Sequence, residues 1–518
     1  MSDFTAENSK GRDPGHNYSS SNVSAVAAAL NGGTDTNCGT PNFFSQYLLE
    51  SEREGLVPAA RIDSAFRRVA LSILRLGLLD VDSPFDGLSQ PKDIGAASTD
   101  ALAKEAAAQS IVLLGNAADV LPLRPAASVA LIGPHGNTTT ELLGMYVGTG
   151  NRLVTNRSAR SVFGSRLGGR MRYEPGLPSL SSTDTAGFSA AAAAAGRSDA
   201  ALVLLGLCES GHGCSEHENL DRASLGLPPA QLALLKLVHA ARPNATVCVF
   251  ISGVSCHDIA GVWVAFFSRC QRYRCRQGPL SVDALDELCT ASLWLSYPGQ
   301  AGATALADAV LGSSAPSGRL PFTLHWENFT QARPMTDMAV RPHRGIAGAT
   351  YRWWAGPVLR PFGFGSSLAR WAWAWESGGP GPASVELNAT TVAAAASQRG
   401  VLLTFAVRAT RTPAPADARL LAAGARGVAI SALGFVSSST LDEAKRMFGF
   451  ARSEPVAVGS AAQLALEMRA DALTTVDENG ARLVRPGRYE IAIEGLRTAV
   501  VLTGAEAEVE PSPFEDHE

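Results

Sequence analysis

The densest group of side chains suited to acid–base chemistry lies between residues 209 and 222. Paired carboxylates serve as general acid and general base when their surroundings push their pKa values apart, and histidines titrate near neutral pH. A solvated surface loop is the alternative, because clustered charges mostly remain in water. The group consists of Glu209, His212, Glu216, His217, Glu218, Asp221 and Arg222.

The segment before this charged loop predicts how the loop is held. Residues 201–205, ALVLL, form an unbroken apolar run, as strands covered on both faces do. The run ends at Gly206. The side chains that follow a parallel strand stand at the carboxyl edge of the sheet, where α/β folds bind ligands. The loop is therefore the best candidate for chemistry in the chain, and a solvated surface loop stays the alternative.

Composition excludes several classes of partner. The chain has 518 residues, enough for two to four domains, and 46% of them are hydrophobic, so it can bury large cores. Its formal charge of −4 gives no basis for binding nucleic acid or an anionic membrane. No apolar run approaches the ~20 residues that span a bilayer. We expect neither nucleic acid nor a membrane as a partner.

Signals of cellular compartment point in two directions. The N-terminal residues, MSDFTAENSKGRDPGHNYSSS, have no apolar core of a signal peptide. Glycosylation sequons argue for secretion instead. Cys208 and Cys214 bracket part of the charged loop and either close it as a disulfide or remain free thiols. The sequence contains no CxxC pair that would indicate a zinc site. The sequons lie at Asn17, Asn22, Asn137, Asn156, Asn244, Asn328 and Asn388.

The chain divides into an α/β part and an all-β part. Helices are expected at residues 23–30, 43–54 and 61–76, with a Pro- and Gly-containing linker over 84–99. Alternating strands and helices over 100–330 predict a largely parallel, two-sided sheet. Residues 261–282 fit neither period and read as an irregular insertion, or as translated non-coding sequence. A loop-rich connection over 331–370, short strands over 371–504 and an acidic tail over 505–518 complete the chain.

Individual elements follow from the hydrophobic periodicity. Strands are expected at 111–114, 129–132, 171–173, 201–205, 246–251 and 291–295, and helices at 100–109, 186–195, 230–241 and 301–311. In the C-terminal part, strands are expected at 401–407, 427–430, 464–468, 489–494 and 499–502.

Several short motifs in this order resemble glycoside hydrolase family 3, most nearly its β-xylosidase branch. The similarity runs from about Asp3 to about Gly504, apart from residues 261–282. The motifs are Ala130-Leu131-Ile132-Gly133-Pro134, Glu218-Asn219-Leu220-Asp221-Arg222, Tyr297-Pro298-Gly299-Gln300-Ala301-Gly302, Gly318-Arg319-Leu320-Pro321, Pro334-Met335-Thr336-Asp337-Met338 and Pro361-Phe362-Gly363-Phe364-Gly365.

The resemblance implies three domains. Residues 1–83 correspond to the C-terminal part of a (β/α)8 barrel, residues 100–330 to an α/β sandwich and residues 371–504 to a fibronectin type III-like domain. In the family the active site lies between the first two. Most of the barrel is missing from this chain, so we interpret the chain as an N-terminally truncated form.

The same resemblance assigns roles to residues. Glu218 matches the acid/base glutamate and Glu216 is the alternative. Asp3 matches the nucleophile, although Phe4-Thr5-Ala6 replaces the family's Cys-Gly-Ala. The candidates for substrate binding are His16, Tyr18 and Arg222, of which Arg222 also suits a role in holding the loop. No metal or other cofactor is implied.

The implied function is retaining, exo-acting hydrolysis of β-xylosides derived from xylan. Retaining chemistry places a nucleophilic carboxylate and a protonated carboxyl group about 5–5.5 Å apart. β-Glucosidase and α-L-arabinofuranosidase are alternatives within the family. A non-catalytic secreted carbohydrate-binding protein is the alternative outside enzymes, because so little of the barrel is present. The family and the sequons together imply an extracellular, secretory or vacuolar location.

Overall fold

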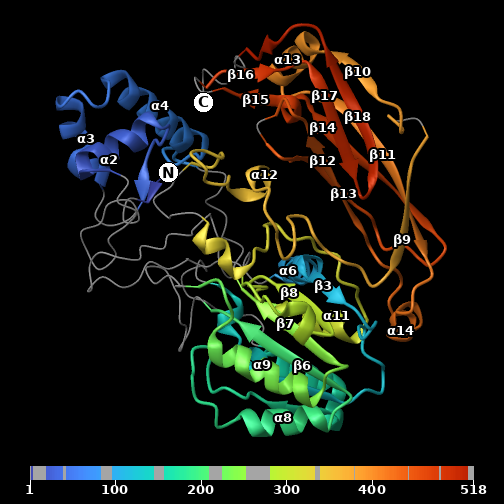
Figure 1. Cartoon of the computed structure of the whole chain (residues 1–518). Helices are drawn as coiled ribbons and strands as arrows, with labels where there is room; N and C mark the ends of the chain where they lie inside the picture. The colour runs from blue at the N-terminus through green and yellow to red at the C-terminus, as the bar shows by residue number, and fades with distance from the viewer. Residues whose placement is uncertain are drawn as a thin grey trace. The chain divides into compact units, whose positions relative to one another are not determined.

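The computed structural model describes residues 2–3, 19–38, 43–82, 96–144, 157–208, 224–252, 280–332, 339–377, 380–441, 443–477 and 480–510. Contacts divide the chain into two units (Figure 1). The first unit contains residues 1–96, 334–338 and 514–518, and the second contains residues 97–333 and 339–513. Among the described residues, no helix combines the length and apolarity needed to cross a bilayer.

The first unit begins with a strand–helix–strand arrangement. Strand β1 (Ser2–Asp3) pairs in parallel with β2 (Asn37–Cys38), and helix α2 (Asn22–Asn31) lies between them in the sequence. Helices α3 (Phe43–Arg53) and α4 (Ala59–Arg75) follow. A small apolar core joins the three helices, and it includes Val26, Leu30, Phe44, Val57 and Ala65.

Helix α4, which corresponds to the helix expected at 61–76, is largely exposed. Of its side chains only Ala65 is buried, and Phe66 is 70% exposed. Polar contacts hold the helix: Arg68 donates to both carboxylate oxygens of Asp35, at 2.8 and 2.7 Å, and Arg61 donates to the carbonyl of Leu30 at 2.6 Å. The hydrogen bond from Arg68 lowers the pKa of Asp35.

The second unit contains a six-stranded sheet in the order β3-β8-β7-β6-β4-β5. Neighbouring strands from β8 to β5 are parallel, as the alternating pattern predicted, and β3 runs antiparallel to β8. The strands are β3 (Val112–Asn116), β4 (Val129–Ile132), β5 (Met171–Glu174), β6 (Ala200–Gly206), β7 (Thr246–Ile251) and β8 (Ala291–Leu295).

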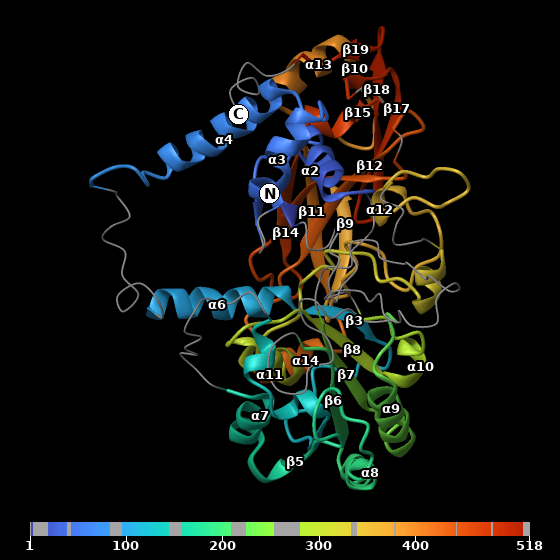
Figure 2. The ribbon, with the colours of Figure 1, turned by 90° about the vertical axis from the view of Figure 1, so that its left-hand side faces the viewer.

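Helices cover both faces of this sheet. In β6, Leu202 and Leu204 face one cluster, which contains residues of α6, α7 and α11, while Ala201 and Val203 face another, which contains residues of α8 and α9. Figure 2 shows α7 and α11 to the left of the strands and α9 to their right. The helices are α6 (Ala97–Ser110), α7 (Ala159–Leu167), α8 (Phe188–Gly196), α9 (Pro229–Ala241), α10 (Leu285–Leu288) and α11 (Gly302–Leu311).

The rest of the second unit is mainly β-structure. A five-stranded sheet in the order β10-β18-β17-β12-β13 and a three-stranded sheet in the order β14-β11-β9 share one core, with Phe405, Leu466, Tyr489 and Val500 fully buried in it. The strands are β9 (Arg370–Trp375), β10 (Val385–Asn388), β11 (Val401–Thr412), β12 (Ser431–Ser437), β13 (Arg446–Arg452), β14 (Ala461–Arg469), β17 (Gly487–Ile493) and β18 (Leu496–Thr503).

Smaller elements complete this part. A third sheet has the order β15-β16-β19, and helix α13 packs on the core through Val392 and Ala396. The remaining elements are α12 (Thr350–Trp353), α13 (Ala389–Ser397), α14 (Asp417–Ala422), β15 (Thr474–Val476), β16 (Arg482–Val484) and β19 (Ala507–Glu508).

Two expectations for this part are corrected. The strand expected at 427–430 is absent apart from a single bridge at Val428, and β12 begins at Ser431 instead. The interval 505–518, expected as a tail, contains β19, which pairs with β16. In both cases the limits of the strand depend on backbone pairing with its neighbours, which the local residue pattern does not reveal.

Candidate active site

The carboxyl ends of the parallel strands meet at one edge of the six-stranded sheet. The register aligns Gly206 at the end of β6 with Ile251 at the end of β7, and Ile251 with Leu295 at the end of β8. The charged segment 209–223, which follows β6 in the sequence, lies outside the described residues. Its two flanks are described, and both are held tightly.

The side chain of Gln231 on α9 holds Gly206. The amide N–H of Gly206 donates to the Gln231 side-chain oxygen at 2.8 Å. The Gln231 nitrogen donates back to the Gly206 carbonyl at 2.9 Å and to the Leu180 carbonyl at 2.8 Å. Gln231 has no exposed surface. A Cβ on Gly206, whose φ is +143°, would stand 1.9 Å from the Ile251 carbonyl oxygen, so glycine is required there.

His135, just beyond β4, bonds to Leu207, the residue that follows Gly206. Its Nε2 lies 2.9 Å from the Leu207 carbonyl oxygen, so Nε2 carries the proton and donates, and its Nδ1 lies 3.1 Å from the Thr138 hydroxyl. Complete burial lowers the pKa of His135 to about 4, against the opposing effect of the Leu207 bond. The imidazole is therefore neutral at pH 7 and serves as a fixed hydrogen-bond donor.

The far flank of the charged segment is anchored by a different set of contacts. The hydroxyl of Ser224 donates to Glu327 and accepts from the Gly226 amide at 2.9 Å. Leu225 packs in a small buried cluster with Phe329 and Trp354. His325 stacks on Phe329 with ring centroids 3.8 Å apart, and burial lowers the pKa of His325 to about 4.

Asp3 belongs to the other unit, in strand β1. It pairs with Cys38 of β2, and β2 is in turn fixed by its neighbours in the sequence. Asn37 is buried and its side-chain oxygen accepts from the Phe44 amide at 3.3 Å, while Asp35 binds Arg68. The turn Asp35-Thr36-Asn37-Cys38 thus supports the strand that carries Asp3.

Most of the site residues named from the sequence fall outside the described residues. They are His16, Tyr18, Glu216, Glu218 and Arg222, so their roles stay predictions. The backbone of Asp3 is described and its side chain is not. Cys208 is disulfide-bonded. In the part of the chain that the structure describes, no group of His, Cys, Asp and Glu side chains is suited to holding a metal ion.

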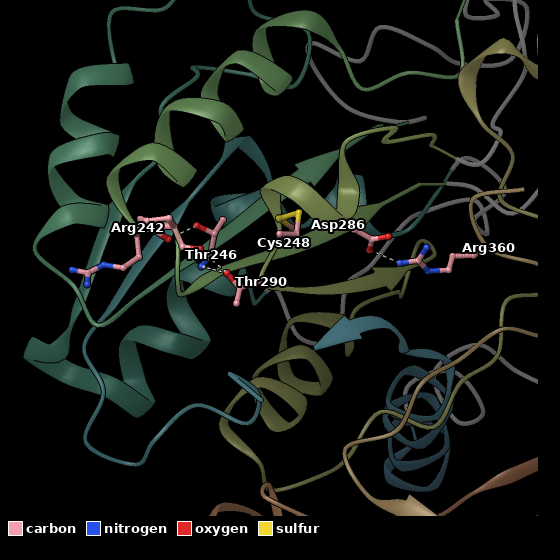
Figure 3. The surroundings of a disulfide bond; sticks show 8 residues. Arg242, Thr246, Cys248, Asp286, Thr290 and Arg360 are labelled. Carbon is pink, nitrogen blue, oxygen red and sulfur yellow. Dashed lines mark hydrogen bonds and ion pairs between the residues drawn. A yellow bond between two sulfur atoms is a disulfide. The ribbon is translucent and has the colours of Figure 1, made fainter. Parts of the chain in front are cut away.

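A disulfide that the sequence analysis did not pair lies toward the amino ends of β7 and β8, away from the carboxyl edge of the sheet. Cys248 in β7 bonds to Cys289, just before β8, and both side chains are buried (Figure 3). The Thr246 hydroxyl donates to the Arg242 carbonyl at 2.7 Å, and the Thr246 amide donates to the Thr290 hydroxyl at 3.3 Å. These contacts fix the start of β7, whose end borders the candidate site.

Sequence reasoning also missed His135 and Gln231. The available signal for His135 was its position directly after the apolar run of β4 and the turn Gly133-Pro134. For Gln231 it was a polar residue in an otherwise apolar segment of α9. Neither signal names a partner, because the bonds span 72 and 25 residues.

Comparison with known sequences relates most of the chain to enzymes that act on glycosides. Residues 111–260 and 274–366 match the Glycosyl hydrolase family 3 C-terminal domain. The exo-1,4-beta-xylosidase bxlB of Emericella nidulans is 31% identical over 499 residues, covering 92% of this chain and 57% of the relative. The exo-1,4-beta-xylosidase xlnD of Aspergillus niger is 30% identical over 515 residues, covering 95% of this chain and 58% of the relative. The chain therefore spans less than two thirds of these relatives.

Solved structures show the same relationship. A GH3 exo-beta-xylosidase in complex with a xylobiose aziridine probe superposes with a TM-score of 0.72 at 27% identity, covering 97% of this chain and 61% of that one. A beta-glucosidase from Listeria innocua superposes with a TM-score of 0.65 at 20% identity, covering 93% of this chain and 61% of that one, and it supports the fold alone.

Proposed function

The chain belongs to glycosyl hydrolase family 3, and we propose that it takes part in retaining, exo-acting hydrolysis of β-xylosides derived from xylan. The proposal rests on the structural similarity to a GH3 exo-beta-xylosidase, which extends over 97% of the chain. The sheet edge supports it, because a carboxylate-rich segment leaves β6 between two anchored flanks.

The proposed chemistry uses two carboxyl groups. Glu218, with Glu216 as the alternative, protonates the oxygen of the departing sugar and then, as a base, activates the water that releases the glycosyl-enzyme intermediate. Asp3 attacks the anomeric carbon. Arg222, His16 and Tyr18 are assigned to substrate binding. The proposed substrate is an oligosaccharide or aryl glycoside, and no cofactor takes part.

The proposed domain layout follows the family. We assign residues 1–83 to the C-terminal part of a (β/α)8 barrel, and the parallel pairing of β1 and β2 on either side of α2 supports this assignment. We assign 100–330 to the α/β sandwich and 371–504 to a fibronectin type III-like domain, with a linker over 84–99 and a connection over 331–370. The two sheets around one core support the last domain.

We also propose that the protein works outside the cytosol. The buried disulfide between Cys248 and Cys289 favours an oxidising compartment. Among the described sequons, Asn137, Asn244, Asn328 and Asn388 are exposed, so a glycan can be attached there. When the chain is produced in a secreting eukaryotic host, treatment with an endoglycosidase should then lower its apparent mass.

Hydrolysis of 4-nitrophenyl β-xyloside by the purified chain tests the activity. We expect release of nitrophenol, loss of that release in Glu218→Ala, and partial recovery with azide, which replaces the water and needs no base. Glu216→Ala is the matched control, and rescue of that variant instead would move the acid/base role to Glu216. Parallel assays with the aryl β-glucoside and α-L-arabinofuranoside compare the three sugars.

A different result would favour another function. If the chain retains xylan oligosaccharides but releases no product from any of the three aryl glycosides, the hydrolase proposal is wrong. A non-catalytic carbohydrate-binding role would then take its place.

A further inference from the structure

We infer that His135 and Gln231 are positioning residues that set the direction in which the chain leaves β6 toward Glu218. This inference rests on the proposed function, since it concerns the acid/base residue of that reaction. Neither residue is assigned to contact the substrate. Their action is through the backbone of Gly206 and Leu207.

Every backbone polar group of Gly206 and Leu207 is bonded. The Gly206 amide and carbonyl both bond to the Gln231 side chain. The Leu207 amide donates to the Ile251 carbonyl at 2.8 Å, and the Leu207 carbonyl accepts from His135. Three of these four bonds come from side chains, which a strand ending in an ordinary loop does not need.

The side chains that make these bonds are themselves rigidly held. His135 is 1% exposed and Gln231 is fully buried. His135 stands in a short helical turn (Pro134–Asn137) in which a Cβ on Gly136 would lie 2.6 Å from the Tyr173 ring. The second donor bond of Gln231, to Leu180, fixes its amide in one orientation. Neither side chain can follow a shift of β6 without losing a buried bond.

The rate of the proposed reaction depends on the geometry at the reacting atoms. Displacement of a catalytic group by about 1 Å can lower the rate on the order of 10²-fold. Glu218 lies ten residues after Cys208 in the sequence, and Cys208 follows Leu207 directly. A change in the direction of the chain at Leu207 is therefore expected to weaken proton donation more than it weakens binding elsewhere.

Two measurements on the full chain test the inference. The variants are His135→Leu, which removes the donor to Leu207, and His135→Gln, which keeps an N–H near the position of Nε2. Gln231→Met removes the clamp on Gly206 at similar volume. Ser453→Ala is the control, because it deletes a buried acceptor, of the Ile430 amide at 3.0 Å, in the β-rich part.

The first measurement is hydrogen exchange of the backbone amides, followed by mass spectrometry of peptides that span residues 204–224. We expect exchange to be at least about tenfold faster in His135→Leu and Gln231→Met, and unchanged in His135→Gln and Ser453→Ala. Unchanged exchange in both of the first two variants would overturn the inference, whether or not the chain is catalytically active.

The second measurement compares aryl xylosides whose leaving groups differ in their need for a proton. A 2,4-dinitrophenyl group leaves without protonation, whereas a phenyl group needs the acid. His135→Leu should lower kcat/KM for the phenyl xyloside by about 10–100-fold and for the dinitrophenyl xyloside by less than about threefold. Equal losses on both substrates would contradict a positioning role. A chain inactive on both would count against the proposed function, and the exchange result alone would then decide the inference.

Discussion

Glu443 holds Arg352 through two parallel hydrogen bonds, and it holds Arg446 in the same way. Arg352 belongs to α12, in the connection after the sandwich, and Arg446 begins β13. The Arg352 Nε donates to one carboxylate oxygen at 2.7 Å, and Arg446 Nη2 donates to the other at 2.6 Å. One buried carboxylate therefore joins the connecting segment to the β-rich part.

Removing this carboxylate should destabilise the second unit. Burial raises the pKa of Glu443, but the hydrogen bonds from Arg446 and Arg352 outweigh burial and lower it, so the group is charged at pH 7. Glu443→Gln leaves two guanidinium groups without their counter-charge, and we expect a loss of about 2–4 kcal/mol in the free energy of unfolding, measured in urea.

The matched control for that experiment is Glu376→Gln. Glu376 also binds one arginine through two bonds, to Arg408 at 2.7 and 2.6 Å, but this pair lies at the surface. The exposed pair is expected to contribute much less. An equal loss in the two variants would contradict the view that the Glu443 group is important because it is buried.

Stability should fall on acidification between pH 6.5 and about 4. Burial is the main cause that lowers the pKa of both His135 and His325 to about 4, from an ordinary value of 6.5. Below pH 6.5 the unfolded chain binds protons that the folded chain rejects, so the free energy of unfolding is greatest above 6.5 and is lost toward pH 4. In His135→Gln one of these two contributions disappears.

Urea unfolding of the original chain and of His135→Gln at pH 7.0 and 4.5 measures this difference. The original chain should lose about 2 kcal/mol more than the variant between the two pH values. Carboxyl groups with a lowered pKa, such as Asp35, affect the free energy of unfolding below about pH 4, and they do so equally in both proteins. Identical pH dependence in the two proteins would show that His135 is not buried in its neutral form.

The disulfide between Cys248 and Cys289 should contribute strongly to the sandwich. It closes a loop with a sequence separation of 41 residues, for which chain entropy predicts about 3–4 kcal/mol. The double variant Cys248→Ala/Cys289→Ala removes the bond without leaving a thiol, and thermal unfolding measures the loss. A thiol reductant is unsuitable because it would also reduce the disulfide of Cys208. A double variant as stable as the original chain would contradict the expected stabilisation.

Fully buried strands were predicted most closely from the sequence. Strands β4, β7 and β8 match the expected limits 129–132, 246–251 and 291–295. Their apolar runs are covered on both faces, so each residue of the strand carries the same signal. The antiparallel direction of β3 was not predicted, because direction depends on the path of the chain and not on local composition.

The candidate site was predicted only in part, and for a related reason. The charged segment after Gly206 stands out by composition, whereas its supports do not. His135 and Gln231 are single polar residues in apolar surroundings, and each becomes meaningful only when folding brings it to Gly206 or Leu207. Likewise the sequence predicted a helix over 61–76 but not the bond between Arg68 and Asp35, which spans 33 residues.

Arg319 should couple the sandwich to the β-rich part of the second unit. It donates to the Gly365 carbonyl at 3.0 Å and to the Ser431 carbonyl at 2.6 Å, and it forms an ion pair with Glu494 at 3.2 Å. Arg319→Met keeps the aliphatic stem and removes these bonds, leaving Glu494 without its cation. We expect a loss of about 2–3 kcal/mol in the free energy of unfolding and a lower midpoint in calorimetry, because Glu494 and the two carbonyl groups lose this partner. Arg408→Met is the control, since its partner Glu376 follows strand β9 of the same sheet. A single transition with an unchanged midpoint in Arg319→Met would show that the apolar contacts of Trp371, which packs against both cores, couple the two parts without the arginine.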